Sequence, residues 1–218
     1  MSKRAIVIAT ALIALVGFAV AGYLYTRSTP AQNYATAPLP ESGTNLIRPS
    51  SPVMGPAQAR VTIVEFFDPS CESCRAFYPI VKQIMAEHGN SVRLVLRYAP
   101  LHDGSEEAVR ILEAARLHDK FQPVLEALLD AQPVWASHSN PNMAKAWEAA
   151  RNAGLDEARA RRDMNLPGID AIIRQDITDL KAVGLRGTPT FYVNGKPLPA
   201  FGRKELENLV RGEVVASN

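Results

Sequence analysis

The sequence predicts an α/β fold class in which a small mixed β-sheet is flanked by helices on both faces. Residues 59–67 and 91–98 are apolar runs rich in β-branched residues, a pattern typical of buried strands. Between them, apolar residues recur at spacings of three and four from Phe77 to Met85, which indicates a helix. A strand, a helix and a strand within about forty residues form a unit whose two strands run parallel.

The rest of the chain predicts a series of helices and then a hairpin. Helical patterns begin at Ser105 and also cover residues 121–131, 141–153, 155–164 and 168–183. A short strand at 190–193 precedes Asn194-Gly195, a strong hairpin signal, and residues 196–200 can return as its partner. A last helix covers 203–211. We therefore expect a helical insertion at about 103–168, between the segments that form the sheet.

The N-terminus predicts export. Lys3 and Arg4 precede an uncharged run at 5–25 that is long enough to cross a bilayer as a helix, so the following residues should be exported. We interpret residues 1–25 as a signal anchor or transmembrane helix, 26–55 as a flexible tether rich in Pro, Ser, Thr and Ala, and 56–218 as the folded domain. Ala19-Val20-Ala21 also fits a signal-peptidase site, and cleavage near Ala21 is the alternative.

The charge balance argues against a nucleic-acid partner. The formal net charge is +2, and the sequence shows no basic stripe interleaved with aromatic residues.

Cys71 and Cys74 are the only cysteines of the chain. A structural zinc ion needs about four ligands, and the four histidines, at positions 88, 102, 118 and 138, do not have ligand spacing. We therefore predict no metal site and no cofactor. A disulfide across so short a loop removes little chain entropy and contributes little to stability, so the pair is better suited to being made and broken.

The position of the pair fits redox chemistry. Cys71 stands where a strand ends and a helix begins, and the partial positive charge and free N–H groups of a helix N-terminus stabilise a thiolate. Because the thiolate is the form that attacks a disulfide, we expect Cys71 to be the exposed nucleophile. Cys74 lies one turn further along and is the buried resolving thiol. An exported location would keep such a pair active.

Residues 56–210 resemble the DsbA-type branch of the thioredoxin superfamily. The resemblance is carried by VEFFDPSCESC at 64–74, by the helical insertion, and by GLRGTPTFYVNG at 184–195. It implies a thioredoxin fold in which Pro189 is a cis-proline facing the cysteines. It also implies that Thr188 and Pro189 bind an extended client segment as an added strand.

The resemblance also gives Glu65 a role. An acidic residue at this position lies beneath the resolving cysteine, where a raised pKa suits it to shuttle protons. The alternative is a surface glutamate at a strand edge.

The residues between the cysteines depart from the family pattern. The strongest oxidases of the family have a Pro-His pair there, and this chain has Glu72-Ser73. A carboxylate beside Cys71 should oppose thiolate formation by on the order of 1 kcal/mol. Ser73 offers a hydrogen bond without charge, and we expect Arg75 to offset Glu72 in part. We therefore predict a less acidic Cys71 and a less oxidising disulfide.

These features predict a protein thiol-disulfide oxidoreductase of the bacterial inner membrane, single-pass, with its catalytic domain facing the periplasm, or a soluble periplasmic enzyme after cleavage. Its clients would be exported proteins that contain cysteine, and its redox partner a membrane protein. The favoured direction is oxidation, with a quinone-linked partner. The alternative is an isomerase or reductase supplied by an electron-donating partner.

Two further classes stay open. One is a Cu(I) metallochaperone that uses both cysteines, with His102 near enough to approach the site, although a solvated loop histidine is the favoured interpretation of His102. The other is a membrane-tethered holdase that needs no redox chemistry. Replacing both cysteines by serine distinguishes these classes, because a holdase would keep its activity without the two thiols.

Overall fold

The computed structural model describes residue 17 and residues 46–217. The predicted membrane segment at 5–25, apart from Gly17, and the first part of the predicted tether lie outside the described residues. Within the described part of the chain, none of the helices combines the length and the apolar character that crossing a bilayer requires.

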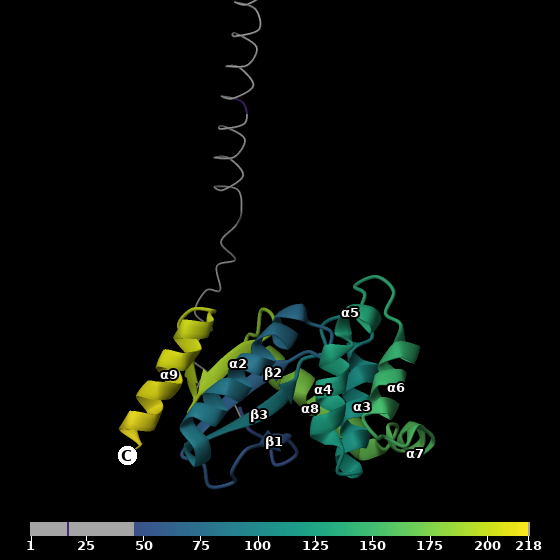
Figure 1. Cartoon of the computed structure of the whole chain (residues 1–218), viewed down its shortest axis with the longest axis horizontal. Coiled ribbons are helices and arrows are strands. Elements are labelled where there is room, and N and C mark those ends of the chain that lie inside the picture. Colours follow the sequence, from purple (N-terminus) through teal and green to yellow (C-terminus); the bar gives the residue numbers. More distant parts are fainter. Residues whose placement is uncertain (1–16, 18–45, 218) are drawn as a thin grey trace, which may run out of the picture. The chain divides into compact units, whose positions relative to one another are not determined.

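A mixed sheet forms the centre of the fold in this part of the chain (Figure 1). Its strand order is β1-β3-β2-β4-β5. The strands are β1 (Val53–Met54), β2 (Val61–Phe67), β3 (Val92–Tyr98), β4 (Thr190–Val193) and β5 (Lys196–Pro197). The central strands β2 and β3 are parallel, which confirms the strand-helix-strand prediction, and the other pairings are antiparallel. The two-residue strand β1 was not predicted, because so short a run has no readable alternation.

Most of the helices begin and end within two residues of the predicted bounds. They are α2 (Glu72–His88), the 3₁₀ turn η1 (Gly89–Ser91), α3 (Ser105–Leu117), α4 (Phe121–Asp130), α5 (Gln132–Trp135), α6 (Met143–Asn152), α7 (Glu157–Asp163), α8 (Pro167–Ala182) and α9 (Arg203–Ala216). The single-turn helix α5 was not predicted. Helix α9 extends five residues beyond the predicted end.

The sheet is covered on both faces, and the alternation of β2 assigns its side chains to them. Ile63 and Phe67 pack in the cluster that includes α2 and α9. Val64 and Phe66 pack in a second cluster that includes Leu180 of α8. Since side chains alternate along a strand, Glu65 belongs to the face shared with Ile63 and Phe67. That is the face covered by the helix that carries the cysteines.

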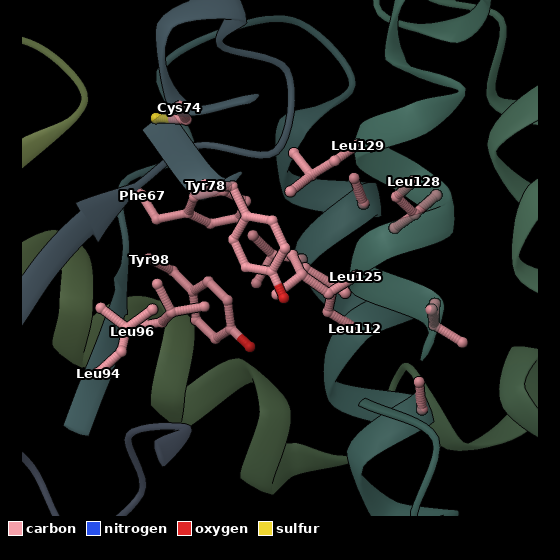
Figure 2. Close-up of a cluster of buried hydrophobic side chains, with 14 of the residues drawn as sticks. Phe67, Cys74, Tyr78, Leu94, Leu96, Tyr98, Leu112, Leu125, Leu128 and Leu129 are labelled. Atoms are coloured by element: carbon pink, nitrogen blue, oxygen red, sulfur yellow. The ribbon is translucent and has the colours of Figure 1, made fainter. Parts of the chain in front are cut away.

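Helices α3 to α7 follow β3 and precede α8 in the chain, and they form a helical block beside the sheet (Figure 1). Trp135 and Trp147 are both buried in it, and their indole N–H groups donate to the Leu128 carbonyl and to Glu107. Figure 2 shows Tyr78 of α2 between residues of the sheet and leucines of α4. The apolar core therefore runs from the sheet into the helical block.

The hairpin forms where the sequence predicts it. Asn194 and Gly195 both have positive φ, 49° and 82°, as a two-residue type I′ turn requires. The Asn194 side chain also accepts a hydrogen bond from the Thr62 backbone N–H at 2.9 Å. The return strand is shorter than predicted and ends at Pro197, which has no N–H to donate to a ladder.

The folded unit begins before the predicted end of the tether. The Leu46 carbonyl accepts a hydrogen bond from the buried Arg97 of β3 at 2.7 Å. Arg48 pairs with Asp179 of α8 at 2.8 Å. Residues 46–54 are thus attached to the sheet and to α8.

Candidate active site

Cys71 lies at the junction of the β2–α2 loop and helix α2. It is the N-cap of α2, with extended backbone angles (φ −79°, ψ 121°), and its own N–H donates to the Asp68 carbonyl at 3.1 Å. The Asp68-Pro69-Ser70 segment breaks the strand, as predicted, and turns the chain into the helix. Cys71 therefore stands at the positive end of the helix.

The two cysteines are free thiols in very different surroundings. Cys74 is fully buried, and Cys71 retains 6% of its surface, so the nucleophile is more covered than we expected. The hydrogen bond with the Cys74 thiol is the main cause that lowers the pKa of Cys71 to about 6. Hydrogen bonds with the Thr188 side chain and from the N–H groups of Cys74 and Ser73 add to this effect, although burial opposes it. Burial, and then the hydrogen bond with Cys71, raises the pKa of Cys74. At neutral pH the pair holds one reactive thiolate beside one protonated thiol.

Glu65 is fully buried on the sheet face that α2 covers. Its neighbours across the sheet are Leu96 and Phe191, both apolar, and neither of its carboxyl oxygens has a hydrogen-bond partner among the residues that the structure describes. Burial, and then the negative charge of Cys71, raises the pKa of Glu65. The charge of Glu65 in turn raises the pKa of Cys74. The alternative of a surface glutamate is therefore wrong.

The loop before β4 reaches the cysteines. The Thr188–Pro189 peptide bond is cis, as the resemblance implied. The Cys71 thiol donates to the Thr188 carbonyl oxygen at 3.2 Å. The Thr190 hydroxyl closes the same loop by donating to the Gly187 carbonyl at 2.7 Å.

Asp68 organises the loop around Cys71, and sequence reasoning did not identify it. Its buried carboxylate accepts hydrogen bonds from the N–H groups of Ser70 and Leu101 at 2.8 Å. It also accepts from the Ser105 hydroxyl and contacts His102 Nδ1 at 2.7 Å. The Asp-Pro dipeptide indicated a turn, but no local pattern pairs an aspartate with residues more than thirty positions away.

Gln132 is a second residue that sequence reasoning missed. Its side-chain amide donates to the carbonyls of Pro69 at 2.8 Å and Cys71 at 3.0 Å, which joins α5 to the active-site loop. Arg75 Nε donates to the same side chain at 2.9 Å. We predicted that Arg75 offsets the charge of Glu72, but its guanidinium bonds Gln132.

Glu72 makes its ion pair with a histidine. Its carboxylate lies 2.9 Å from His138 Nε2, and more than half of the side chain is exposed. The backbone N–H of Glu72 is the main cause that lowers the pKa of this carboxyl, and His138 adds to the effect. Ser73 contributes a hydrogen bond to Cys71 through its backbone N–H.

Two of the four histidines meet at this site. The His102 and His138 ring centroids are 5.5 Å apart. His102 is held by Asp68, so it is not the solvated loop histidine that sequence reasoning favoured. Across the described residues, no group of three or more His, Cys, Asp or Glu side chains is arranged to hold a metal ion.

Comparisons with solved structures agree with this geometry. A thioredoxin-like oxidoreductase from Silicibacter pomeroyi DSS-3 is 32% identical, with a TM-score of 0.67, over 78% of this chain and 95% of that one. The thiol-disulfide exchange protein alpha-DsbA2 from Wolbachia pipientis has a TM-score of 0.66 over 80% of this chain and 91% of that one. At 20% identity the second similarity shows the fold alone.

The curated relatives are much longer proteins. A Na⁺/H⁺ antiporter, NhaA, from Herminiimonas arsenicoxydans is 30% identical over 146 residues, which is 67% of this chain and 22% of that one. The chain thus spans about a fifth of the length of these relatives. The family described as thioredoxin matches residues 48–211, most of the chain. The chain therefore belongs to the thioredoxin family, and its fold is similar to that of a DsbA-type protein.

Proposed function

We propose that Cys71 and Cys74 exchange disulfides with exported proteins that contain cysteine, and that the favoured direction is oxidation of the client. The unequal pair of thiols carries this proposal. The pKa of Cys71 is lowered to about 6 and that of Cys74 is raised, so one sulfur is ready to attack or leave at neutral pH and the other is protected.

Oxidation proceeds by two exchanges. A client thiolate attacks Cys71 Sγ of the Cys71–Cys74 disulfide, that bond breaks, and its electron pair leaves on Cys74 Sγ. A second client thiolate then attacks the client sulfur of the mixed disulfide, forms the client disulfide and releases Cys71 as a thiolate. Two electrons remain on the cysteine pair. A quinone-linked membrane protein is the partner that would remove them.

Glu65 is the proposed proton shuttle. Cys74 must gain a proton when it leaves and lose one when it attacks, because its thiolate is disfavoured by burial. Glu65 is the buried carboxyl whose charge acts on Cys74, and its raised pKa suits it to hold a proton and pass it on.

Thr188 and Pro189 are the proposed client-binding residues. The Thr188 carbonyl accepts a hydrogen bond from Cys71 when that residue is a protonated thiol, so this loop lies against the reacting sulfur. A client strand that pairs with this loop would bring its own cysteine to the same place.

The runner-up is an isomerase or reductase supplied with electrons by a membrane donor. The pKa of Cys71 near 6 favours it, since this value lies closer to the roughly 7 of thioredoxin than to the roughly 3.5 of a strong oxidase. A less stabilised thiolate makes a less oxidising disulfide.

The proposed setting is the bacterial inner membrane, with residues 1–25 as the anchor, the part of the 26–55 segment that precedes residue 46 as the tether, and the folded residues in the periplasm. The apolar run at 5–25 and the preceding Lys3 and Arg4 support it. Release as a soluble periplasmic protein by cleavage near Ala21 is the alternative.

The deciding experiment is the reduction potential of the cysteine pair, measured on the full chain equilibrated with glutathione buffers. A potential above about −180 mV supports the oxidase, and one near −200 mV or below supports the isomerase or reductase. No two-electron exchange at all would refute thiol-disulfide chemistry. Titration with Cu(I) would then test the metallochaperone, and chaperone assays of the double serine variant would test the holdase.

A further inference from the structure

Four acid-base side chains form a continuous series beside Cys71. Asp68 contacts His102 at 2.7 Å, the His102 ring lies 5.5 Å from the His138 ring, and His138 contacts Glu72 at 2.9 Å. They come from three segments of the chain, namely the start of α2 with the loop before it, the loop after β3, and the loop after α5. The two histidines therefore lie between the two carboxylates in this series beside the nucleophile.

His102 is fixed at one end of this series. The Asp68 carboxylate is completely buried and contacts both the ring Nδ1 and the backbone N–H of His102, the latter at 3.2 Å. Such a contact sets the orientation of the ring and raises its basicity. The ring itself is 31% exposed, so it can exchange protons with water.

His102 interacts electrostatically with the reacting sulfur. Partial burial disfavours its protonated form, but the hydrogen bond and charge of Asp68, and then the charges of Cys71 and Glu72, outweigh this and raise the pKa of His102. Interactions between charges are reciprocal, so a protonated His102 stabilises the Cys71 thiolate by the same free energy.

The charges that face His102 can be counted element by element. Asp68 precedes α2, Cys71 and Glu72 begin it, and His138 approaches from the loop after α5. The thiolate and the two carboxylates together carry a charge of −3. A protonated His102 reduces this local charge to −2, which favours the thiolate. Asp103 follows His102 on its own loop and adds a further negative charge to either count.

We propose that His102 is a positioning residue for the disulfide exchange. Its imidazolium, held by Asp68, supplies to Cys71 the positive charge that the Glu72-Ser73 pair lacks. His138 neutralises the charge of Glu72. The inference rests on the proposed function, because it assigns a role in setting the reactivity of the same cysteine pair. It goes beyond that function by placing the stabilising cation outside the segment between the cysteines.

The principal test is His102→Asn in the full chain. Asparagine keeps a side-chain N–H near the position of Nδ1 for Asp68 and removes the ionisable group. The rate of Cys71 alkylation by iodoacetamide, followed from pH 4 to 9, reports the thiolate without any client. We expect the pH of half-maximal alkylation to rise by about one unit in the variant, which is a tenfold change in proton concentration. We also expect its disulfide to be about tenfold more resistant to reduction by glutathione.

The matched control is His118→Asn. His118 also pairs with an aspartate, Asp163 at 2.8 Å, but it lies in the helical block. We expect its alkylation profile and potential to match those of the wild type. His102→Lys restores a cation, so it should recover part of the thiolate. If His102→Asn does not fold, His102→Lys and the His138 variants below still decide the question.

A double-mutant cycle tests the second half of the proposal. His138→Asn should raise the pH of half-maximal alkylation when Glu72 is present and have little effect when combined with Glu72→Gln. A wild-type profile in His102→Asn, or an equal effect of His138→Asn in both backgrounds, would overturn the inference. Both outcomes are measured by alkylation of Cys71 and do not depend on client turnover. Failure of the wild-type protein to exchange with glutathione would instead refute the proposed function.

Discussion

The Cys71 thiol lies 3.2 Å from the Thr188 carbonyl oxygen, although 117 residues separate them in the chain. The contact joins the N-terminus of α2 to the loop before β4. It exists because β2 and β4 are neighbours in the sheet, with Glu65 opposite Phe191 and Phe66 opposite Thr190. The sheet register therefore brings the proposed client-binding loop to the nucleophile.

The two cysteines should give opposite phenotypes. Cys71→Ser removes the accessible thiolate and should abolish exchange with a model client such as ribonuclease that carries scrambled disulfides, one of which the Cys71 thiolate would attack. Cys74→Ser keeps the attacking sulfur but cannot resolve the mixed disulfide, so it should accumulate covalent client adducts. Non-reducing gels and mass spectrometry distinguish them. Adducts formed through Cys74 in Cys71→Ser would reverse the assignment of nucleophile and resolving thiol.

Replacing Glu65 should raise stability at the expense of activity. The buried carboxyl has no hydrogen-bond partner in the described part of the chain, so Glu65→Leu removes an uncompensated polar group. We expect the free energy of unfolding in urea to rise by about 1–3 kcal/mol, while client oxidation at pH 7 slows. Unchanged activity would argue against the proton shuttle, and lower stability would show that the carboxyl has a partner such as water.

The same residue predicts a pH dependence. The folded-state pKa of Glu65 is raised above its ordinary value, so the folded protein holds a proton that the unfolded chain has lost. This contribution is complete below the unfolded pKa and is lost as pH rises through the folded one. In a Cys71→Ala/Cys74→Ala background, which removes the opposite contribution of Cys71, stability should fall with rising pH. Adding Glu65→Gln should flatten that dependence, and parallel curves would contradict the raised pKa.

The sequence predicted the cysteine pair from its local spacing, and the resemblance to the DsbA-type branch implied the buried Glu65 and the Thr188–Pro189 loop. It did not predict Asp68, Gln132 or the meeting of His102 with His138. Those contacts join the β2–α2 loop to the loops after β3 and α5, and they depend on how the helical block packs on the sheet. Local periodicity sets where a helix lies in the chain, but it does not fix which loop residues the packed helix will bring to a site.

Gln132 should couple the helical block to the active site. Its side chain donates to two loop carbonyls and accepts from Arg75, so Gln132→Ala leaves buried polar groups without partners. We expect the free energy of unfolding to fall by about 1–3 kcal/mol and the Cys71 alkylation rate to change. Gln122→Ala, which removes an exposed bond to Glu126, is the control and should have little effect on either. Equal effects of the two variants would refute the coupling.

The Arg97–Asp176 pair should be the most sensitive ion pair attached to the sheet. Arg97 is completely buried and Asp176 nearly so, and the Asp176 carboxylate also accepts from the Tyr98 backbone N–H at 2.7 Å. Asp176→Ala leaves a buried guanidinium with one fewer carboxylate and should lower the free energy of unfolding by about 3–5 kcal/mol.

Asp170 provides the matched control on the same helix. It pairs with Arg110 at 2.6 Å, but both side chains are partly exposed, so Asp170→Ala should cost no more than about 1 kcal/mol. The double variant Arg97→Leu/Asp176→Leu should recover stability relative to Asp176→Ala, because no uncompensated charge remains in the core. Urea denaturation of the four proteins measures all these differences. Equal losses of unfolding free energy in Asp170→Ala and Asp176→Ala would mean that burial does not set the strength of the pair. A double variant less stable than Asp176→Ala would mean that Arg97 stabilises the fold without Asp176, through its remaining partners, which include the Leu46 carbonyl and Asp179.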